Sequence, residues 1–248
     1  VFVYVIAIAT YHRAQAFGDW TYKMLKDAGL LHKVVLFLQC PEDVRDYGEA
    51  YPELKVVQSP QGLLETANFI SQHFPAGTNI VQLHDDVKHI VRFVSKAQSE
   101  EVDDVDAVFT EAFRLMQAHR LGLGGMFPYN NTFHKPKHAV TTDLSFVHDP
   151  VTFIHLYGDK SPVVLQKKFE QKQDYQRSIE FYKRDGGVLR LNHYAFEHQG
   201  YNKSNLKGGV ADTMSRTLED DKVATEVFVR DYALYIDVYK NDSKKGDK

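Results

Sequence analysis

Strand-like and helix-like segments alternate through the first 86 residues of the chain. The expected strands are runs of β-branched and aliphatic residues at 1–9, 34–38, 54–57 and 79–83. Apolar residues recur at helical spacing between them, over 18–30, 42–50 and 63–73. Parallel strands need crossover connections of this kind, so we predict a parallel sheet with helices on its faces.

The second half of the chain is less regular. Helical spacing predicts helices over 103–119, 163–184 and part of 210–238, and 188–191 predicts a short strand. The polar and aromatic segment over 126–150 is consistent with a strand and a loop. No repeat or linker divides the sequence, so we expect one α/β domain over 1–240 and a disordered tail over 241–248.

Composition excludes few classes of protein. The 248 residues are 43% hydrophobic and 25% charged, which is enough for a sizeable core. No stretch approaches the roughly 20 apolar residues of a membrane span, so no membrane partner is expected. Cys40 is the one cysteine, so an internal disulfide is excluded and a reducing compartment is favoured. We expect a cytoplasmic rather than a secreted protein.

Charge is distributed unevenly along the chain. The net charge is -3, but residues 160–207 hold ten Lys/Arg against five Asp/Glu, a balance of +5. The rest therefore carries -8. A basic segment of this kind suits the phosphates of a nucleotide or a polymer, and an ordinary solvated helix face explains it equally well.

The sharpest local signal is His84-Asp85-Asp86, directly after the expected strand at 79–83. Two adjacent carboxylates at the end of a buried strand are costly unless a positive charge compensates them. Mg²⁺ or Mn²⁺ does so, and it takes oxygen ligands from carboxylates and substrate phosphates together. A turn with two solvated acids remains the alternative.

Other polar residues follow strands or begin helices in the predicted sheet. Thr10, Tyr11 and Arg13 follow the first strand, where a hydroxyl, an aromatic face and a guanidinium suit a ribose, a base and a phosphate. Gly62 and Asn68 lie at the helix over 63–73, where small residues permit close approach of a ligand. A generic loop explains the first set equally well, and the second set is a weak signal when taken alone.

Two further groups of residues lie in the basic half. Asp174 is expected near the middle of the helix over 163–184, where a carboxylate facing a cleft acts as a general base; an acid paired with a nearby lysine is the alternative. Later, 191–209 holds His193, His198, Lys203 and Lys207 among glycines. A histidine there can complete a metal site, and the lysines can hold a diphosphate.

Several motifs are missing from the sequence. One cysteine and no HExxH spacing argue against zinc, and the lack of a P-loop or of GxGxxG after the first strand argues against a kinase or an ordinary dehydrogenase. No GxSxG nucleophile elbow is present.

The order of these motifs resembles the GT-A nucleotide-sugar glycosyltransferases over roughly residues 3–210. The metal-binding DxD motif of that family falls on His84-Asp85-Asp86, whose first position departs from it. The resemblance implies a GT-A fold with a mixed, mostly parallel sheet. It also implies that Asp86 binds the metal and that Asp85 reaches the ribose or the metal. Asp174 matches the acidic residue of the family's xED helix, although Gln173 stands where Glu is usual. His198 matches the late metal-binding histidine, with His193 as the competing candidate.

A narrower resemblance lies in IEFYKRDGGVLRLNHYAFEHQGYNKSNLKGG. This segment is similar to the TET/JBP-associated glycosyltransferases of phages and trypanosomatids. That family implies transfer of a hexose from a UDP-sugar to a hydroxymethylated pyrimidine in DNA. It also implies a host-cell cytoplasm for a phage protein, or a nucleus for a eukaryotic one.

These expectations combine into one hypothesis with three rivals. The base and ribose would lie over Thr10, Tyr11 and Arg13, and Asp86 with His198 would hold Mn²⁺ or Mg²⁺ against the diphosphate. Asp174 would take the acceptor proton in an inverting reaction, or position substrate in a retaining one. The rivals are a protein or glycan acceptor, a nucleotidyltransferase, and a non-catalytic binding module.

Overall fold

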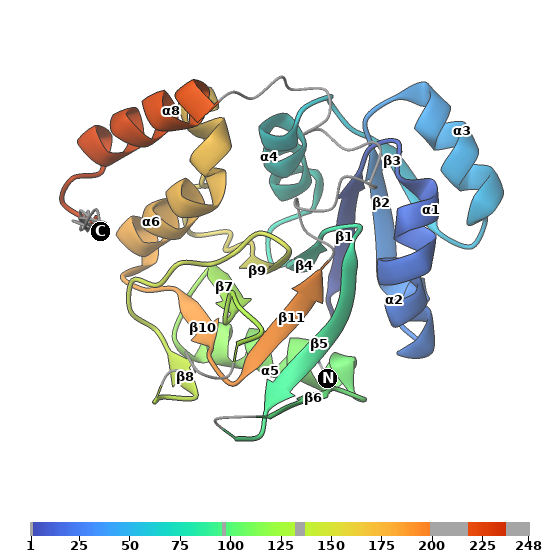
Figure 1. Cartoon of the computed structure of the whole chain (residues 1–248), viewed down its shortest axis with the longest axis horizontal. Helices are drawn as coiled ribbons and strands as arrows, with labels where there is room; N and C mark the ends of the chain where they lie inside the picture. The colour runs from blue at the N-terminus through green and yellow to red at the C-terminus, as the bar shows by residue number, and fades with distance from the viewer. Residues whose placement is uncertain (1, 96–97, 132–136, 199–217, 237–248) are drawn as a thin grey trace, which may run out of the picture.

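The computed structural model describes residues 2–95, 98–131, 137–198 and 218–236 (Figure 1). A central sheet of eight strands has the order β3-β2-β1-β4-β9-β7-β10-β8, and a second sheet of three strands has the order β11-β5-β6. Helices flank the central sheet, so the fold is α/β with a mixed sheet, as expected. The predicted tail at 241–248 lies outside the described residues.

The first half of the central sheet is parallel, as the alternating pattern predicts. Its strands are β1 (Val5–Thr10), β2 (Val34–Leu38), β3 (Lys55–Gln58) and β4 (Asn79–Leu83). β1 lies between β2 and β4, with Ile8 paired to Leu36 on one side and to Leu83 on the other. The carboxyl ends of β1 and β4 therefore meet at one edge of the sheet, where α/β proteins form their sites.

The second half of the sheet contains a strand that the sequence analysis did not assign. β9 (Val151–His155) is buried throughout and runs antiparallel to both β4 and β7 (Leu123–Met126). β10 (Leu189–Leu191) is parallel to β7, and β8 (Val140–Thr141) closes the sheet antiparallel to β10. β9 and β8 thus run against the other six strands.

The small sheet packs beside the central one. β5 (Val87–Phe93) pairs antiparallel with β6 (Ser99–Glu101) and with β11 (Tyr194–His198). None of these three strands was predicted. β5 begins directly after the His84-Asp85-Asp86 turn, and His198 pairs with Val87 at the end of β11. Strand pairing therefore brings His198 to this turn across more than a hundred residues.

Helices form where apolar residues recur at helical spacing. They are α1 (Ala14–Phe17), α2 (Lys23–Asp27), α3 (Pro41–Ala50), α4 (Leu63–His73), α5 (Val105–Ala118), α6 (Gln173–Asp185) and α8 (Leu218–Asp231). A π-helix, η1 (Gly18–Tyr22), joins α1 to α2, and short 3₁₀ helices lie at η2 (Leu31–Lys33) and η4 (Lys167–Lys172). Figure 1 shows α1, α2 and α3 on one side of the molecule and α6 with α8 on the other.

One predicted helix is divided. The expected helix over 163–184 becomes η4 followed by α6, because Phe169 and Lys172 leave helical geometry with φ of -114° and -126°. Phe169 is buried against Phe228 of α8, and this packing overrides the local helical pattern. Asp174 consequently lies in the first turn of α6 rather than in the middle of a long helix.

The core lies on both faces of the central sheet. One large cluster packs α2 and α5 against the sheet through residues such as Leu25, Phe109 and Phe113. A second cluster, on the other face, includes Phe37 of β2, Ile70 of α4 and Phe181 of α6. Gly29 ends the first helical stretch with φ of +70°, the left-handed conformation typical of a C-cap glycine. Within the described residues, no helix combines the length and apolar character needed to cross a bilayer.

Candidate functional site

The turn after β4 buries two adjacent carboxylates. Asp85 and Asp86 are only 5% and 6% exposed. The Thr21 hydroxyl fixes this turn, since it lies 2.9 Å from the His84 carbonyl oxygen, to which it donates, and 2.9 Å from the Val87 nitrogen, from which it accepts. Thr21 belongs to the π-helix η1, a rare geometry that is frequent at functional sites. Sequence reasoning missed Thr21 because it lies in an apparently regular helix.

The carboxyl end of β1 holds Asp85 in position. The Thr10 hydroxyl donates to Asp85 Oδ2 over 2.5 Å, and Arg13 Nη1 lies 3.5 Å from Asp85 Oδ1. The Tyr47 hydroxyl from α3 lies 2.7 Å from the Thr10 hydroxyl. Burial raises the pKa of Asp85, although the Thr10 hydrogen bond and the Arg13 charge act in the opposite direction. Thr10, Arg13 and Asp85 therefore form one cluster, as their positions at strand ends predict.

His198 completes the neighbourhood of Asp86. Its Nδ1 lies 3.9 Å from Asp86 Oδ2 at the end of β11. Burial alone would raise the pKa of Asp86, but the His198 contact and the charges of His84 and Arg13 lower it. The competing candidate, His193, precedes β11 and directs Nδ1 to the Ala139 carbonyl oxygen at 2.8 Å. The geometry thus places His198, and not His193, beside Asp86.

His148 was not singled out from the sequence but lies against the same cluster. Its ring is 5.7 Å from the ring of His198 and 5.7 Å from that of Phe196. Burial, with the nearby His84 and His198, lowers the pKa of His148 to about 4. Its imidazole is therefore neutral at physiological pH, and it adds no positive charge beside Asp86. Only its neighbours in space, which the sequence does not reveal, distinguish it from other histidines.

A second group of carboxylates lies at the start of α6. Asp149 is 7% exposed and accepts hydrogen bonds from Arg177 Nη1 at 2.9 Å and Gln173 Nε2 at 2.8 Å. Asp174 Oδ1 accepts from the Tyr175 backbone nitrogen at 2.9 Å. Burial, and then the charge of Asp149, raise the pKa of Asp174 to about 7. A carboxylate with this pKa accepts a proton efficiently near neutral pH.

The remaining predicted residues are less closely tied to these clusters. The Tyr11 and His12 rings are in tilted contact next to Thr10, with centroids 4.0 Å apart and an interplanar angle of 42°. Gly62 has φ of +118° and donates its N–H to Gln39 Oε1 at 2.8 Å. The Asn68 side-chain amide makes two hydrogen bonds of 2.9 Å to the Leu165 backbone. It therefore anchors the segment before η4. Lys203 and Lys207 lie outside the described residues.

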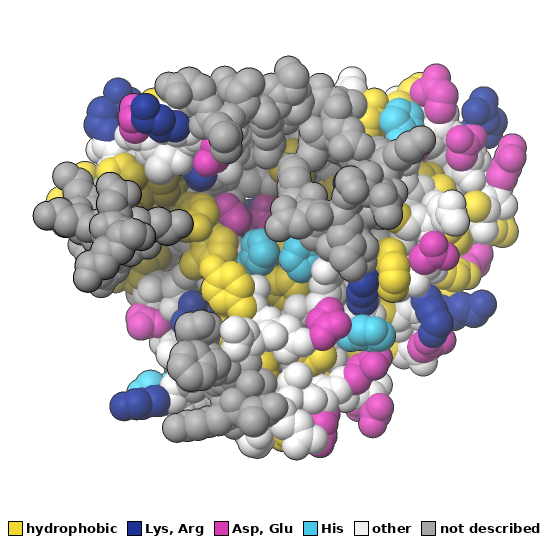
Figure 2. Space-filling view, viewed as in Figure 1, with side chains coloured by type: hydrophobic (Ala, Val, Ile, Leu, Met, Phe, Trp, Pro, Cys, Tyr) yellow, Lys and Arg dark blue, Asp and Glu magenta, His cyan; other side chains and the backbone are white. Residues whose placement is uncertain are grey.

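The space-filling view agrees with this grouping. Figure 2 shows histidine and acidic side chains gathered near the middle of one face, bordered by hydrophobic side chains. Next to Asp174 in the chain, the Tyr175 ring stacks on Phe146, with centroids 4.4 Å apart. Tyr175 is 46% exposed. An accessible aromatic ring therefore follows Asp174 directly.

Comparison with known structures identifies the fold. S. aureus TarS (residues 1–349) matches 79% of this chain with a TM-score of 0.50 and 10% identity. The match covers 59% of the TarS chain, so this chain spans less than two thirds of that structure. At this identity the likeness establishes the fold alone, and the fold is of the GT-A type expected from the sequence.

Two other solved structures resemble the chain more weakly. The mannosyltransferase PcManGT from Pyrobaculum calidifontis, in complex with GDP-Man and Mn²⁺, matches 60% of this chain and 43% of its own, with 13% identity and a TM-score of 0.40. A 4-diphosphocytidyl-2C-methyl-D-erythritol synthase from Anaerococcus prevotii matches 91% and 96%, with 12% identity and a TM-score of 0.41. No protein-family model matches the chain, and no curated protein matches its sequence.

Proposed function

We propose that this chain is a metal-dependent glycosyltransferase that takes its sugar from a nucleotide-sugar donor. One observation carries the proposal: Asp86 and His198, from the ends of β4 and β11, come within 3.9 Å at the carboxyl edge of a GT-A sheet. Both side chains are largely buried, with exposures of 9% and 28%. A buried acid and a histidine at this edge suit a cation that faces substrate phosphates.

The donor atoms of this pair fit a divalent cation. Two metal–ligand bonds of about 2.1 Å span up to about 4.2 Å, so the two side chains can bind one ion with little movement. A histidine nitrogen favours Mn²⁺ over Mg²⁺, which prefers oxygen ligands. When bound, the ion would neutralise the charge of a departing nucleoside diphosphate.

The nucleotide would lie over the end of β1. The Tyr11 ring suits stacking against a base, and Asp85 suits hydrogen bonds from ribose hydroxyls. Thr10 and Arg13 already hold the Asp85 carboxylate in one orientation. Such preorganisation reduces the entropy lost when the donor binds. Gly62, Asn68, Lys203 and Lys207 remain further candidates for donor contacts.

Asp174 would act on the acceptor. With a pKa raised to about 7, it can remove the proton from an acceptor hydroxyl as the sugar is transferred. This role suits inversion of configuration, whereas in a retaining reaction Asp174 would position substrate. The exposed Tyr175 ring and the stacked Phe146 ring next to it suit an acceptor with a flat face, such as a base or a sugar.

Narrower identities for donor and acceptor are supported by sequence resemblance alone. They are a UDP-hexose as donor and a hydroxymethylated pyrimidine in DNA as acceptor. Lys160, Lys167, Lys168, Lys172 and Lys183 each lie within 3.0 Å of a carboxylate, so their charge is largely compensated within the fold. This compensation weakens the case for DNA phosphates as partners of these lysines and keeps a protein or glycan acceptor as the alternative.

The decisive experiment removes the carboxylate of Asp86. We expect Asp86→Ala to lose Mn²⁺-dependent release of nucleoside diphosphate from a sugar donor while circular dichroism reports an intact fold. Asp103→Ala, which removes an exposed acid elsewhere, is the matched control and should behave as wild type. Near-normal turnover of Asp86→Ala would refute the metal assignment.

A ligand screen then separates the rival functions. Thermal shifts with UDP-sugars, GDP-sugars and nucleoside triphosphates, each with and without Mn²⁺, would distinguish a glycosyltransferase from a nucleotidyltransferase. A non-catalytic module predicts no metal-dependent shift with any of them. Donor turnover assayed with and without hydroxymethylated DNA tests the acceptor.

A further inference from the structure

Three side chains that can bind a metal converge beside the β1–α1 loop, outside the Asp86 cluster. They are His12 in that loop, Cys40 just before α3, and Asp43 in the first turn of α3. His12 Nδ1 lies 3.0 Å from Asp43 Oδ1 and 4.0 Å from Cys40 Sγ. Their ligand atoms all lie within 4.8 Å of one another.

The surrounding fold holds this trio together. Asp43 is only 3% exposed, and its Oδ2 accepts the backbone N–H of His12 at 2.9 Å. Pro41 occupies the first position of α3, and Cys40 before it is extended with φ of -143°. The donor atoms therefore converge without any ligand, which lowers the cost of binding one.

We propose that His12, Cys40 and Asp43 form a Zn²⁺ site. In tetrahedral zinc centres, bonds of about 2.0–2.3 Å place ligand atoms about 3.3–3.6 Å apart. The two distances from His12 Nδ1, 3.0 and 4.0 Å, lie on either side of this range. Small side-chain rotations are enough to bring all three atoms to bonding distance of one ion.

The donor set selects the class of metal. A thiolate is a soft ligand and an imidazole is intermediate, so this trio favours Zn²⁺ over Mg²⁺ and Mn²⁺. Three protein ligands leave one tetrahedral position for water or another ligand, unlike closed structural sites with four. The sequence argued against zinc because its ligands occur in no recognised spacing, and the fold brings them together from 28 and 31 residues apart.

Binding requires a defined proton balance. The Cys40 thiol must lose its proton to solvent, and burial raises the pKa of that thiol. The neutral His12 ring carries its hydrogen on Nε2 once Nδ1 binds the ion. Where the free imidazole is already neutral and the thiol is still protonated, one proton is released for each ion bound, and the affinity should rise about tenfold per pH unit.

The site is connected to the β1 loop that contains the proposed donor residues. The His12 ring contacts the Tyr11 ring, and α3 also carries Tyr47, which contacts Thr10. A bound ion would immobilise this loop and so alter donor affinity. That consequence depends on the proposed function, whereas zinc binding itself does not.

Cobalt is the probe that tests the site. Co²⁺ replaces Zn²⁺ and gives a thiolate-to-cobalt absorption band, which Cys40 alone can produce because it is the one cysteine of the chain. We expect one equivalent of Co²⁺ to give this band in chelator-treated protein without nucleotide, and Zn²⁺ to abolish it. Asp86→Ala protein should give the same band, which separates this test from that of the proposed function.

Variants define the outcome. Cys40→Ser should lose the band, and His12→Gln should weaken Co²⁺ and Zn²⁺ binding by on the order of 100-fold. His32→Gln, at an exposed histidine in η2, should bind as wild type. Absence of the band in wild-type protein would overturn the proposal. A band with unchanged affinity in His12→Gln would also overturn it, since that result indicates a thiol acting alone.

Discussion

α6 carries one aspartate near each end, and the pKa values of these two aspartates are shifted in opposite directions. Asp185 ends the helix and Asp174 lies in its first turn. The surroundings lower the pKa of Asp185 and raise the pKa of Asp174 to about 7. Because the helix and residue type are shared, the difference comes from the partners of each carboxylate.

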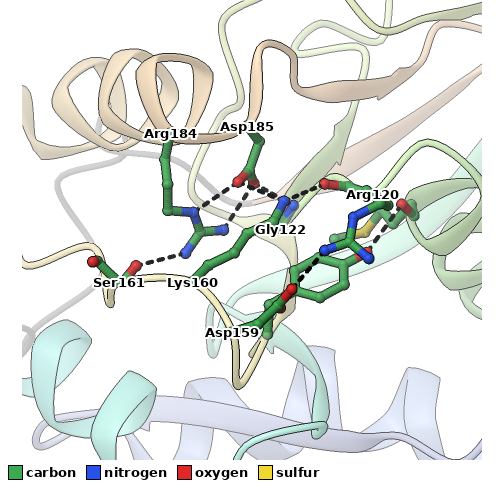
Figure 3. Close-up of polar contacts among 9 residues, drawn as sticks. Arg120, Gly122, Asp159, Lys160, Ser161, Arg184 and Asp185 are labelled. Atoms are coloured by element: carbon green, nitrogen blue, oxygen red, sulfur yellow. Dashed lines mark hydrogen bonds and ion pairs between the residues drawn. The ribbon is translucent and has the colours of Figure 1, made fainter.

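The Asp185 carboxylate accepts hydrogen bonds from several donors (Figure 3). Its side chain is 0% exposed and accepts from Lys160 Nζ at 2.9 Å, from the Gly122 nitrogen at 2.7 Å, and from Arg184 Nε and Nη2 at 2.8 Å each. Burial alone would raise the pKa of Asp185, but these donors reverse the effect. This cluster joins α6 to β7 and stabilises the fold.

The Asp174 carboxylate accepts fewer hydrogen bonds than that of Asp185. Its one described hydrogen bond comes from the adjacent Tyr175 backbone, and the nearby Arg177 directs a bond to Asp149 instead. Asp149 also adds a second negative charge, which raises the pKa of Asp174 further. A partly buried carboxylate that is incompletely paired is a typical acid or base of an active site.

The two residues should therefore affect stability with opposite dependence on pH. The lowered pKa of Asp185 stabilises the fold above the ordinary carboxyl range, and this stability is lost as the pH falls through that range. The raised pKa of Asp174 acts in reverse: stability declines as pH rises from the ordinary value of 3.8 to about 7. At neutral pH the Asp185 carboxylate therefore stabilises the fold, whereas the raised pKa of Asp174 lowers its stability.

The largest effect is expected at Asp174. Asp174→Asn should lower kcat by roughly 10²–10⁴-fold, because the amide cannot accept the acceptor proton. Donor affinity, measured by calorimetry with UDP and Mn²⁺, should be unchanged, and the decline in stability between pH 4 and 7 should flatten. Turnover close to that of wild type would exclude Asp174 as the base.

Asp185→Asn should instead act on stability. The change leaves Lys160 and Arg184, each 16% exposed, without their negative partner. We expect the free energy of unfolding in urea to fall by about 3 kcal/mol. Turnover per folded molecule should stay at the wild-type level, and a selective loss of kcat would contradict the separation of the two roles.

The pH profile sharpens the comparison. If Asp174 is the base, kcat/KM should rise with pH through an apparent value of about 7. Asp149→Asn removes a negative charge beside it, so the acidic limb should move to lower pH. Lys160→Met, which changes the Asp185 cluster, should leave the limb in place. An unchanged limb in Asp149→Asn would show that Asp149 does not set this titration.

Much of the parallel half of the fold could be predicted from the sequence. The strands at β2 and β4 and the helix α4 coincide with the segments inferred from local patterns, because the signals there are continuous apolar runs and helical spacing. β9 and β11 were missed. They are as long as β2 and β4, but each is placed by antiparallel pairing with a distant strand rather than by local sequence.

Part of the candidate site could be predicted from the sequence, and part of it could not. The grouping of Thr10, Arg13 and Asp85 follows from the rule that parallel strands share a carboxyl edge. His148 and Asp149 were not predicted, because their importance depends on what the fold packs around them. The opposite pKa shifts of Asp174 and Asp185 could not be predicted either, because in the sequence each is one acidic residue on a lysine-rich helix.

The smallest expected effect compares two lysines that bind carboxylates. Lys160 is 16% exposed and contacts the buried Asp185, whereas Lys167 is 62% exposed and contacts Glu65 and Glu170. Lys167→Met should change the free energy of unfolding by less than about 0.5 kcal/mol, because solvent screens exposed pairs. Lys160→Met should cost about 1.5–3 kcal/mol, since it removes a charged hydrogen bond from a buried acid. Equal losses in urea denaturation would mean that burial of the Asp185 cluster does not strengthen its ion pairs, and the contrast with Asp174 would then rest on the number of donors alone.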